Sequence, residues 1–321
     1  MQGTAELNQA DPVAGFVDQS HPSFAAADIL SDRSDELVAA IRAACLKNGF
    51  FCIEPAAQQS SSIPAALRRM QEFFAIDDQD PRKQNVRQDD SRRGWRPRYT
   101  EPAYQPGTVA SLEAFDFGVS ELGDNQFWPA VSGFREASTA CWNKYLQLAD
   151  GALELLALAA GLESDFFSSR CNSRMLNSMR LLHYAGDLPA TAANNVGIAA
   201  HTDFECITLL YQSAPGLELR DVNGNWLDAA GSGERIVVML DDMLERWTNG
   251  YFRATGHRVR ETDEQRFSIV LFVAVNEDLT IAPLQQFVSD EMPVRYQPVT
   301  QAQHLEDEVR RAQKNSDDLT G

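Results

Sequence analysis

Two polar side chains stand at the start of an otherwise apolar stretch, AAHTDFECITLLYQ, which covers residues 199–212. His201 and Asp203 are separated by one residue, and on a β-strand residues i and i+2 point to the same face. An imidazole and a carboxylate that reach one point in space can bind a metal ion together. The sequence therefore predicts part of a metal site on this strand. A hydrogen-bonded surface pair at a strand end is the structural alternative.

A third ligand is available in His257, one of five histidines in the chain. It lies at the start of the strand-like segment GHRVR. Two histidines and one carboxylate on one face of an octahedron leave three positions open, which is the arrangement of non-haem Fe(II) oxygenases. His201, Asp203 and His257 are thus the candidate metal ligands and the candidate catalytic centre. An HxD pair alone matches often by chance, so a second motif is needed.

That second motif is an arginine and a serine in RFSIVLFVAV, where Arg266 and Ser268 share one face of a predicted strand. A guanidinium on an otherwise apolar strand is costly unless it is paired. An arginine fork beside a hydroxyl suits a bound carboxylate. The alternative is that Arg266 lies at the strand end and pairs with Asp263 or Glu264 just upstream.

Together these motifs resemble a known family, the isopenicillin N synthase-like branch of the 2-oxoglutarate- and Fe(II)-dependent dioxygenases. The order, spacing and filler residues match in HTDFECITLLYQ, GLELRDVNGNW, DDMLERWTNGYFRATGHRVR and RFS. The N-terminal elements of the family are similar to NGFFCIE and RRGWRPRY, so the resemblance covers most of the chain. It implies a mainly β fold with flanking helices, built on a distorted double-stranded β-helix, or jelly roll.

The resemblance also implies roles for single residues. It makes the HxD pair and His257 the ligands of Fe(II), and it makes Arg266 and Ser268 the clamp on the distal carboxylate of 2-oxoglutarate. Tyr184, which ends RLLHY, matches a tyrosine that hydrogen-bonds the same carboxylate. A core or rim tyrosine is the structural alternative for Tyr184.

The substrate side is indicated by fewer residues. Arg92 and Arg96, in SRRGWR, match positions that contact a substrate carboxylate in some relatives, and Phe204 directly follows the ligand aspartate. The two arginines indicate a small, anionic substrate. A solvated loop in an acidic protein is the alternative for them.

Three residues depart from the family pattern. Leu182 stands where many plant members carry an asparagine that contacts the co-substrate. Glu205 stands where a glycine usually follows the metal motif, and Asp241 where a glycine usually precedes an aspartate. On a regular strand Glu205 would share the metal-facing side. We expect instead that the chain bends there and that Glu205 points to solvent or to a salt bridge.

The predicted activity is oxidation of a small molecule with Fe(II), 2-oxoglutarate and O₂, with release of succinate and CO₂. Hydroxylation is the default outcome, and desaturation or ring closure are its variants. Two alternatives stay open. One is an oxidase of the isopenicillin N synthase type, which uses no 2-oxoglutarate and holds substrate with its Arg-x-Ser pair. The other is a non-catalytic jelly-roll protein that binds a small carboxylate.

The elements that must position these residues follow from periodicity and turn signals. Residues 34–54 read as a helix that stops at Gly49 and a strand, and Asn223-Gly224 predicts a hairpin. Many short strands from residue 176 onward indicate a sandwich or barrel. The remaining expected segments are a helix over 64–75, a basic polar loop over 76–100, a long helix over 132–159 and a polar helix over 300–314. We expect a single dioxygenase domain over 1–321, with a mostly helical part over 1–175, the jelly-roll core and metal site over 176–285, and a helix and tail over 286–321.

Composition limits the partners and the compartment. The 321 residues include 28 basic and 46 acidic side chains, a net charge of −18, which disfavours nucleic acid and anionic membrane surfaces as partners. Five cysteines without a CxxC pair read as free core thiols in a reducing cytosol. The N-terminus lacks a secretory signal and no apolar run is long enough to cross a bilayer, so a cytoplasmic location is expected.

Overall fold

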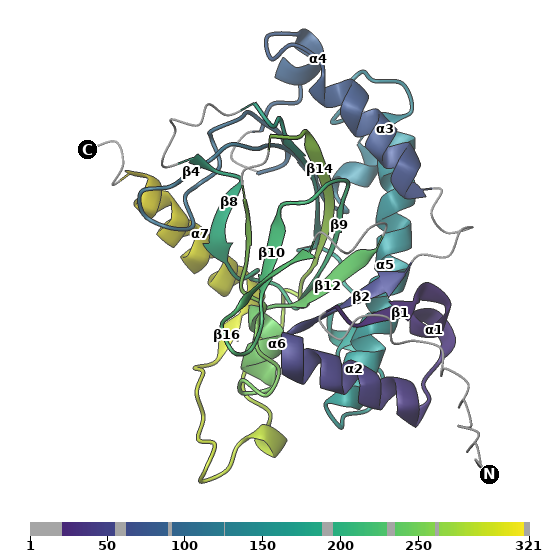
Figure 1. The fold of residues 1–321 in the computed structure, drawn as a ribbon, viewed down its shortest axis with the longest axis vertical. Helices are drawn as coiled ribbons and strands as arrows, with labels where there is room; N and C mark the ends of the chain where they lie inside the picture. The colour runs from purple at the N-terminus through teal and green to yellow at the C-terminus, as the bar shows by residue number, and fades with distance from the viewer. Residues whose placement is uncertain are drawn as a thin grey trace, which may run out of the picture.

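Two β-sheets of eight and four strands form the centre of the molecule. The structure, a computed structural model, describes residues 21–54, 62–88, 92–124, 126–187, 195–229, 235–260 and 263–317. Figure 1 shows the helices α1, α2, α3 and α5 along one side of the larger sheet, and the strands β8 and β10 of the smaller sheet on its other side. The N-terminal residues 1–20 lie outside the described residues.

The large sheet is antiparallel except for its first pair of strands, which is parallel. Four of its strands come from the part of the chain before residue 176, which the sequence predicts to be mostly helical. Its strands, in spatial order, are β1 (Ser23–Ala25), β2 (Phe50–Glu54), β12 (Ile236–Leu240), β9 (Ile207–Gln212), β14 (Arg266–Val273), β6 (Ser178–Tyr184), β5 (Glu113–Phe117) and β3 (Gly94–Arg96).

The small sheet faces the large one and carries two of the candidate ligands. The Asn223-Gly224 hairpin is confirmed, because it joins two antiparallel strands of this sheet and Gly224 has a φ of +88°. The strands of this sheet are β11 (Trp226–Asp228), β10 (Leu217–Arg220), β13 (His257–Val259) and β8 (Ile198–His201). Two short two-stranded sheets pair β4 (Val109–Ala110) with β7 (Asn195–Val196), and β15 (Thr280–Ile281) with β16 (Val299–Thr300).

Strand β14 shows how the large sheet separates two apolar layers. Phe267, Ile269 and Leu271 belong to the cluster that packs against the helices. Val270 and Phe272 belong to the cluster between the sheets, on the face that Arg266 and Ser268 share by alternation. The face predicted for the Arg-x-Ser pair is therefore the inner one.

The helices pack on the outer layer around α5, which contacts three other helices and the strands β9 and β14. Helix α2 ends at Gly49, as predicted, because this glycine takes the left-handed conformation that closes a helix end. The polar C-terminal helix is confirmed as α7. The helices are α1 (Ala26–Ser31), α2 (Asp35–Asn48), α3 (Ser62–Phe74), α4 (Pro81–Gln84), α5 (Phe134–Ala159), α6 (Asp242–Trp247) and α7 (Gln301–Asp317), with 3₁₀ turns η1 (Glu121–Gly123), η2 (Ser168–Arg170) and η4 (Gln285–Phe287).

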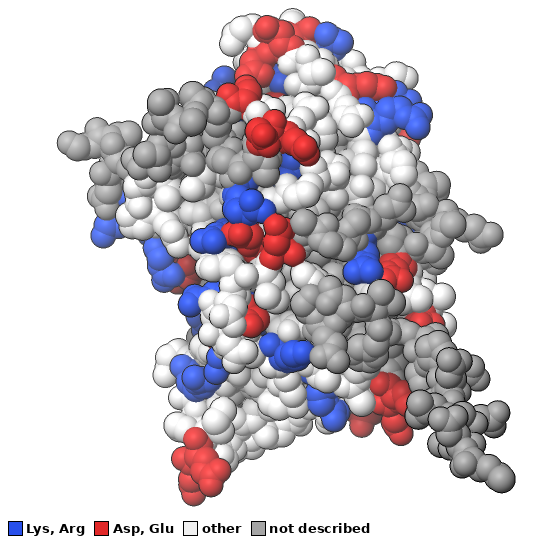
Figure 2. Space-filling model, in the orientation of Figure 1, with Lys and Arg blue, Asp and Glu red and all other residues white. Residues whose placement is uncertain are grey.

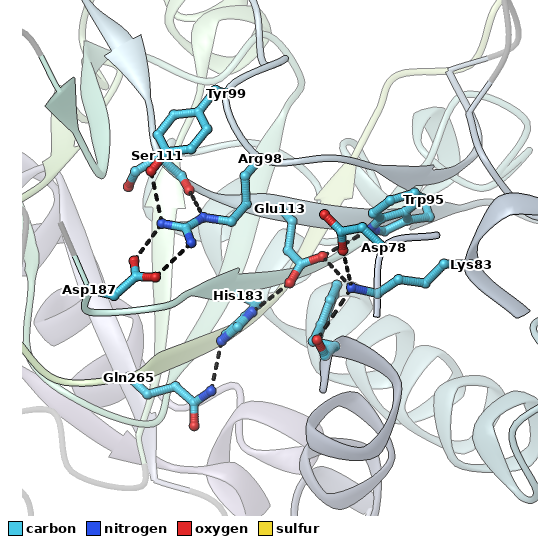
Figure 3. Close-up of polar contacts among 11 residues, drawn as sticks. Asp78, Lys83, Trp95, Arg98, Tyr99, Ser111, Glu113, His183, Asp187 and Gln265 are labelled. Atoms are coloured by element: carbon cyan, nitrogen blue, oxygen red, sulfur yellow. Dashed lines mark hydrogen bonds and ion pairs between the residues drawn. The ribbon is translucent and has the colours of Figure 1, made fainter. Parts of the chain in front are cut away.

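The sequence predicted a loop over residues 76–100, but this segment also contains α4 and β3. A buried ion pair anchors it to the sheet (Figure 3). Lys83 is 1% exposed, and its ammonium lies 3.0 Å from a carboxylate oxygen of Glu113. The same carboxylate accepts hydrogen bonds from Trp95 Nε1 at 2.9 Å and from His183 Nδ1 at 2.7 Å. His183 therefore faces away from the ligand histidines, as alternation along β6 predicts.

Three global features bear on the expectations from composition. All five cysteines are free and buried, as predicted. No helix among the described residues has the length and apolarity needed to cross a bilayer. Acidic and basic side chains are interspersed over the face drawn in Figure 2.

Candidate active site

The stretch 199–212 is interrupted at its polar residues. Strand β8 of the small sheet ends at His201, and β9 of the large sheet begins at Ile207. The stretch is therefore not one strand: the chain changes sheets between these residues, and the expected bend at Glu205 lies in the connection. Backbone hydrogen bonds hold the connecting segment, from Asp242 N to Asp203 O at 3.1 Å and from Cys206 N to Val273 O at 2.9 Å.

The three candidate ligands meet at this change of sheet. His201 and His257 are register partners across β8 and β13, and Asp203 lies in the connecting segment. Asp203 Oδ1 is 3.6 Å from the Nε2 atom of each histidine. One ligand atom from each of the three residues lies within 4.8 Å of the other two. The convergence comes from strand pairing and a bend, and not from alternation along one strand as the sequence suggested.

Backbone carbonyls orient both imidazoles. His201 Nδ1 lies 2.8 Å from the carbonyl oxygen of Ala199, and His257 Nδ1 lies 3.1 Å from that of Thr255. A carbonyl oxygen can only accept, so each Nδ1 donates its proton. Each Nε2 then keeps its lone pair toward Asp203, which is the tautomer that binds a metal.

The charge states of these groups also suit a divalent cation. Burial opposes ionisation of Asp203, but His257 and His201 outweigh it and lower the pKa of Asp203 to about 2. Burial lowers the pKa of His257 to about 4. At neutral pH the site thus offers a carboxylate and neutral imidazole. The second oxygen of Asp203 is buried without a hydrogen-bond partner among the described residues, so the donor set fits an iron ion.

A second polar group lies on the inner face of the large sheet. Arg266 is 1% exposed, and it pairs in register with Tyr184 across β14 and β6. Its guanidinium lies 4.6 Å from the centre of the Tyr184 ring, and its Nε and Nη2 atoms donate to Gln212 Oε1 at 3.3 and 3.1 Å. Arg266 Nη1 and Ser268 Oγ are buried without partners among the described residues. These donors fit a bound carboxylate.

The two acidic residues considered as alternative partners of Arg266 lie at the surface and not beside its buried guanidinium. Asp263 and Glu264 are exposed side chains, whereas Arg266 is buried. Burial lowers the pKa of Arg266, and the neighbouring Tyr184 opposes that shift. A bound anion would offset the cost of this buried charge.

One cavity of about 890 Å³ joins the ligand group to the inner face of the large sheet. The three candidate ligands and Tyr184 line it. Arg266 and Ser268 do not form part of the cavity wall, and they lie beside it, next to Tyr184. Leu182 lines the cavity too, and offers no polar atom where many plant members have an asparagine.

The arginines of the cavity wall are mostly charge-paired. Arg96 lies 2.9 Å from a carboxylate oxygen of Glu101, and Arg180 lies 3.0 Å from Glu101 and 2.7 Å from Asp116. Arg92 also lines the cavity, is exposed, and makes no side-chain hydrogen bond or ion pair with the described residues. The structure thus places both predicted arginines at the cavity, with the charge of Arg96 already balanced. Arg180 was missed, although its alternation with Leu182 and Tyr184 could have indicated it.

Aromatic side chains form the part of the cavity nearest the ligands. The ring of Tyr104 stacks on His201, with centroids 4.2 Å apart and an angle of 13° between the rings. Phe204 and Phe272 also line the cavity. Tyr104 lies in an irregular segment, and no periodic signal in the sequence could have located it.

Helix α7 closes another part of the same cavity. Leu305, Val309 and Ala312 of this helix contribute to the wall. Gln301, at the start of α7, donates from Nε2 to the carbonyl oxygen of Phe204 at 2.8 Å. This contact fixes the start of the helix to the segment that carries Asp203.

Glu205 does not point to solvent and makes no salt bridge with the described residues, so the expectation for its side chain is wrong. The chain does bend, but Glu205 is 8% exposed and lines the cavity. Burial, together with the charge of Asp203, raises the pKa of Glu205 to about 8. The other acidic departure, Asp241, is buried off the cavity wall and accepts a hydrogen bond from the Thr208 hydroxyl at 2.9 Å.

Comparison with protein families agrees with this geometry. The model of the 2OG-Fe(II) oxygenase superfamily matches residues 176–275. A second model, described as the N-terminal region of a non-haem dioxygenase in morphine synthesis, matches residues 22–132. A 2-oxoglutarate-Fe(II) type oxidoreductase of Emericella nidulans is 31% identical over 310 residues, which cover 88% of this chain and 85% of that relative. A 2-oxoglutarate-dependent dioxygenase of Monascus ruber is 31% identical, over 80% of this chain and 84% of its own.

Solved structures share the fold. A full-length protein of Neurospora crassa, solved in complex with alpha-KG, superposes with a TM-score of 0.77 at 23% identity, over 91% of this chain and 95% of that one. The dioxygenase for auxin oxidation of rice gives a TM-score of 0.72 at 21% identity, over 92% of this chain and 95% of that one. The predicted jelly-roll core with flanking helices is therefore confirmed.

Proposed function

Since the chain belongs to the 2-oxoglutarate- and Fe(II)-dependent oxygenases, we propose that His201, Asp203 and His257 hold its iron. The enzyme is an oxidoreductase that uses Fe(II), 2-oxoglutarate and O₂ to oxidise a small molecule. The relatives support this activity and not the oxidase that works without 2-oxoglutarate. The observation that carries the assignment is the convergence of two Nε2 atoms and one carboxylate oxygen at the wall of a large cavity.

The bound iron supplies the redox chemistry that links decarboxylation of 2-oxoglutarate to oxidation of the substrate by O₂. The chain supplies position and charge. Backbone carbonyls accept hydrogen bonds from the protonated Nδ1 atoms of both histidines, so that the Nε2 lone pairs stay directed at one point. Apolar residues on the inner faces of the sheets, Leu182, Leu210 and Val270 among them, limit access of water to the inner end of the cavity.

We further propose that Arg266, Ser268 and Tyr184 bind the distal carboxylate of 2-oxoglutarate. Arg266 would donate through Nη1, since its Nε and Nη2 atoms are held by Gln212. Ser268 would donate its hydroxyl from the same face of β14. Tyr184 stands between this pair and the cavity, so it would contact the same carboxylate from the cavity side.

For the substrate, we propose a small anionic molecule with an apolar body. Arg92, Arg96 and Phe204 line the cavity. Of the two arginines, Arg92 has a charge without a carboxylate partner among the described residues, so it is the stronger candidate for the anion. Arg96 would act with Glu101, and Phe204 would pack against the body of the substrate.

We also propose that the residues of this chain form one dioxygenase domain in a reducing, cytoplasmic compartment. The large sheet supports a single domain, because it combines strands from before and after residue 176. The five buried free thiols support the compartment.

The test is succinate release by the purified chain with Fe(II), 2-oxoglutarate and a library of small metabolites rich in carboxylic acids. We expect release that requires both Fe(II) and 2-oxoglutarate, rises with a subset of the acids, and is lost in Asp203→Ala. Substrate oxidation without succinate would contradict the proposal. Full turnover by Asp203→Ala would equally contradict the ligand assignment.

A further inference from the structure

We propose that Glu205 is a specificity-determining residue that accepts a hydrogen bond from an O–H or N–H group of the substrate. The inference rests on the proposed function of the cavity. It adds a second recognition point to the anion contact at Arg92. The substrate class is thereby narrowed to small acids that also carry a hydroxyl or an N–H group.

Glu205 differs from the other carboxylates of the cavity wall. Besides the ligand Asp203, the wall contains Glu101, Asp116 and Glu205. Glu101 pairs with two arginines, and Asp116 pairs with Arg180. Glu205 has no ion pair with the described residues, and its side chain accepts one hydrogen bond, from the backbone N–H of Phe204 at 3.1 Å. It is therefore a carboxyl group, more than nine-tenths buried, with hydrogen-bonding capacity left over at a cavity wall.

The backbone around Glu205 is held firmly. Its carbonyl oxygen accepts a hydrogen bond from Met243 N at 2.9 Å, and the carbonyl oxygen of Phe204 accepts one from Gln301. The side chain is thus presented from a fixed segment, two residues from Asp203. A substrate group that reaches Glu205 would lie close to the ligand group, where its position determines which carbon is oxidised.

The chemistry does not depend on the charge state of Glu205. A carboxyl group keeps an acceptor oxygen whether or not it carries a proton. A buried polar site rejects an analogue that lacks the matching group, because the site is then left unpaired. The family that this chain resembles usually has a glycine at the position of Glu205, and a glycine has no side chain that could make such a contact.

The experiment uses the Fe(II)-loaded enzyme with matched pairs of aromatic carboxylic acids. Each pair differs only in whether an O–H or N–H group is free or methylated. We expect the free member to be preferred about tenfold or more in kcat/KM by the wild type. Glu205→Leu should reduce this preference to about threefold or less, with the loss mainly in KM, whereas Glu205→Gln keeps an acceptor of the same shape and should retain most of it.

Asp241→Asn is the matched control. Asp241 is buried and lies near Asp203, but it is off the cavity wall, so Asp241→Asn should keep the wild-type preference. Equal loss of preference in Asp241→Asn and Glu205→Leu would show a general electrostatic effect and overturn the inference. Unchanged preference in Glu205→Leu would also overturn it. Absence of succinate release from the wild type with every acid would instead contradict the proposed function.

Discussion

Gln212 Oε1 accepts hydrogen bonds from two nitrogens of Arg266, from Nε at 3.3 Å and from Nη2 at 3.1 Å. Gln212 also stands opposite Ser268 in the pairing of β9 with β14. One amide therefore fixes the guanidinium and leaves its Nη1 atom, with the Ser268 hydroxyl, for a ligand. Gln212 is thus a positioning residue for the proposed 2-oxoglutarate site.

Gln212→Leu should weaken 2-oxoglutarate binding without touching the co-substrate. We expect the KM for 2-oxoglutarate to rise about fivefold to thirtyfold, since Arg266 keeps its charge and the loss of its orienting partner costs about 1–2 kcal/mol. Gln212→Glu should raise it further, because a carboxylate there would compete for Arg266. The measurement is succinate release against 2-oxoglutarate concentration. Wild-type KM values in both variants would contradict this positioning role.

Replacing the clamp itself should have a larger effect. We expect Arg266→Met to raise the KM for 2-oxoglutarate by about a hundredfold, because hydrogen bonds to charged groups contribute about 1.5–3 kcal/mol. Ser268→Ala removes a single neutral donor, and we expect about a threefold to tenfold rise. Arg96→Gln, whose arginine pairs with Glu101 and has no contact with Arg266, is the control and should leave the KM for 2-oxoglutarate near the wild-type value. If Arg96→Gln raised the KM for 2-oxoglutarate as much as Arg266→Met does, the assignment of the carboxylate clamp would be wrong.

Metal content should depend chiefly on the three proposed ligands. His257→Ala removes one of three donors, so we expect the Fe(II) affinity to fall by more than about a hundredfold. Metal analysis of protein loaded with Fe(II) under anaerobic conditions and then gel-filtered measures this. His304→Gln is the control, because His304 lies 2.8 Å from Asp242 and outside the ligand group. Equal metal content in both variants would refute the assignment.

Tyr104 should act on the metal site through stacking. Tyr104→Phe keeps the ring on His201 and loses only the 3.3 Å hydrogen bond to Glu101, so Fe(II) affinity should stay close to that of the wild type. Tyr104→Ala frees the His201 ring, and we expect affinity to fall about tenfold, the scale seen when groups that orient ligands are removed. Anaerobic titration with Fe(II) separates the two results. A larger loss in Tyr104→Phe than in Tyr104→Ala would contradict the stacking role.

The buried ion pair between Lys83 and Glu113, drawn in Figure 3, should affect the stability of the fold and the dependence of that stability on pH. Lys83→Met leaves Glu113 as a buried carboxylate without its ammonium, so we expect a loss of about 3–5 kcal/mol in the free energy of unfolding by urea. Burial opposes ionisation of Glu113, but His183 and Lys83 hold its pKa below the usual value. Ionised Glu113 therefore stabilises the fold at pH values above the ordinary glutamate pKa. This contribution is lost as the pH falls through the lower pKa of Glu113 in the folded protein.

Glu113→Gln provides the check on that pH dependence. This variant removes the titrating group, so the part of the acid-induced loss of stability that Glu113 causes should disappear. Urea unfolding at a series of acidic pH values measures it for the variant and the wild type. Parallel pH curves for the two proteins would contradict a lowered pKa at this position.

The sequence predicted the candidate ligands from their residue types and the inner face of β14 from local alternation. Alternation placed Arg266 and Ser268 on the inner face, and the structure agrees. The same alternation brought His201 and Asp203 together in the prediction, whereas in the structure a change of sheet brings these two candidate ligands together. Glu205 was placed wrongly because its position depends on elements far along the chain: α6 holds its backbone carbonyl, and α7 closes part of the cavity. Stacking of Tyr104 on His201 is non-local in the same way.

The basic cavity wall in an acidic chain has a consequence for the rate at which its ligands arrive. The chain carries a net charge of −18, whereas Arg92, which has no carboxylate partner among the described residues, lines the cavity and Arg266 lies beside it. A dianion such as 2-oxoglutarate is repelled at long range and is attracted only near the arginines, within about a Debye length of 8–10 Å at ordinary ionic strength. Moderate salt shortens the range of the repulsion more than it weakens a buried contact. Encounter with 2-oxoglutarate should therefore become faster as the ionic strength rises from very low values.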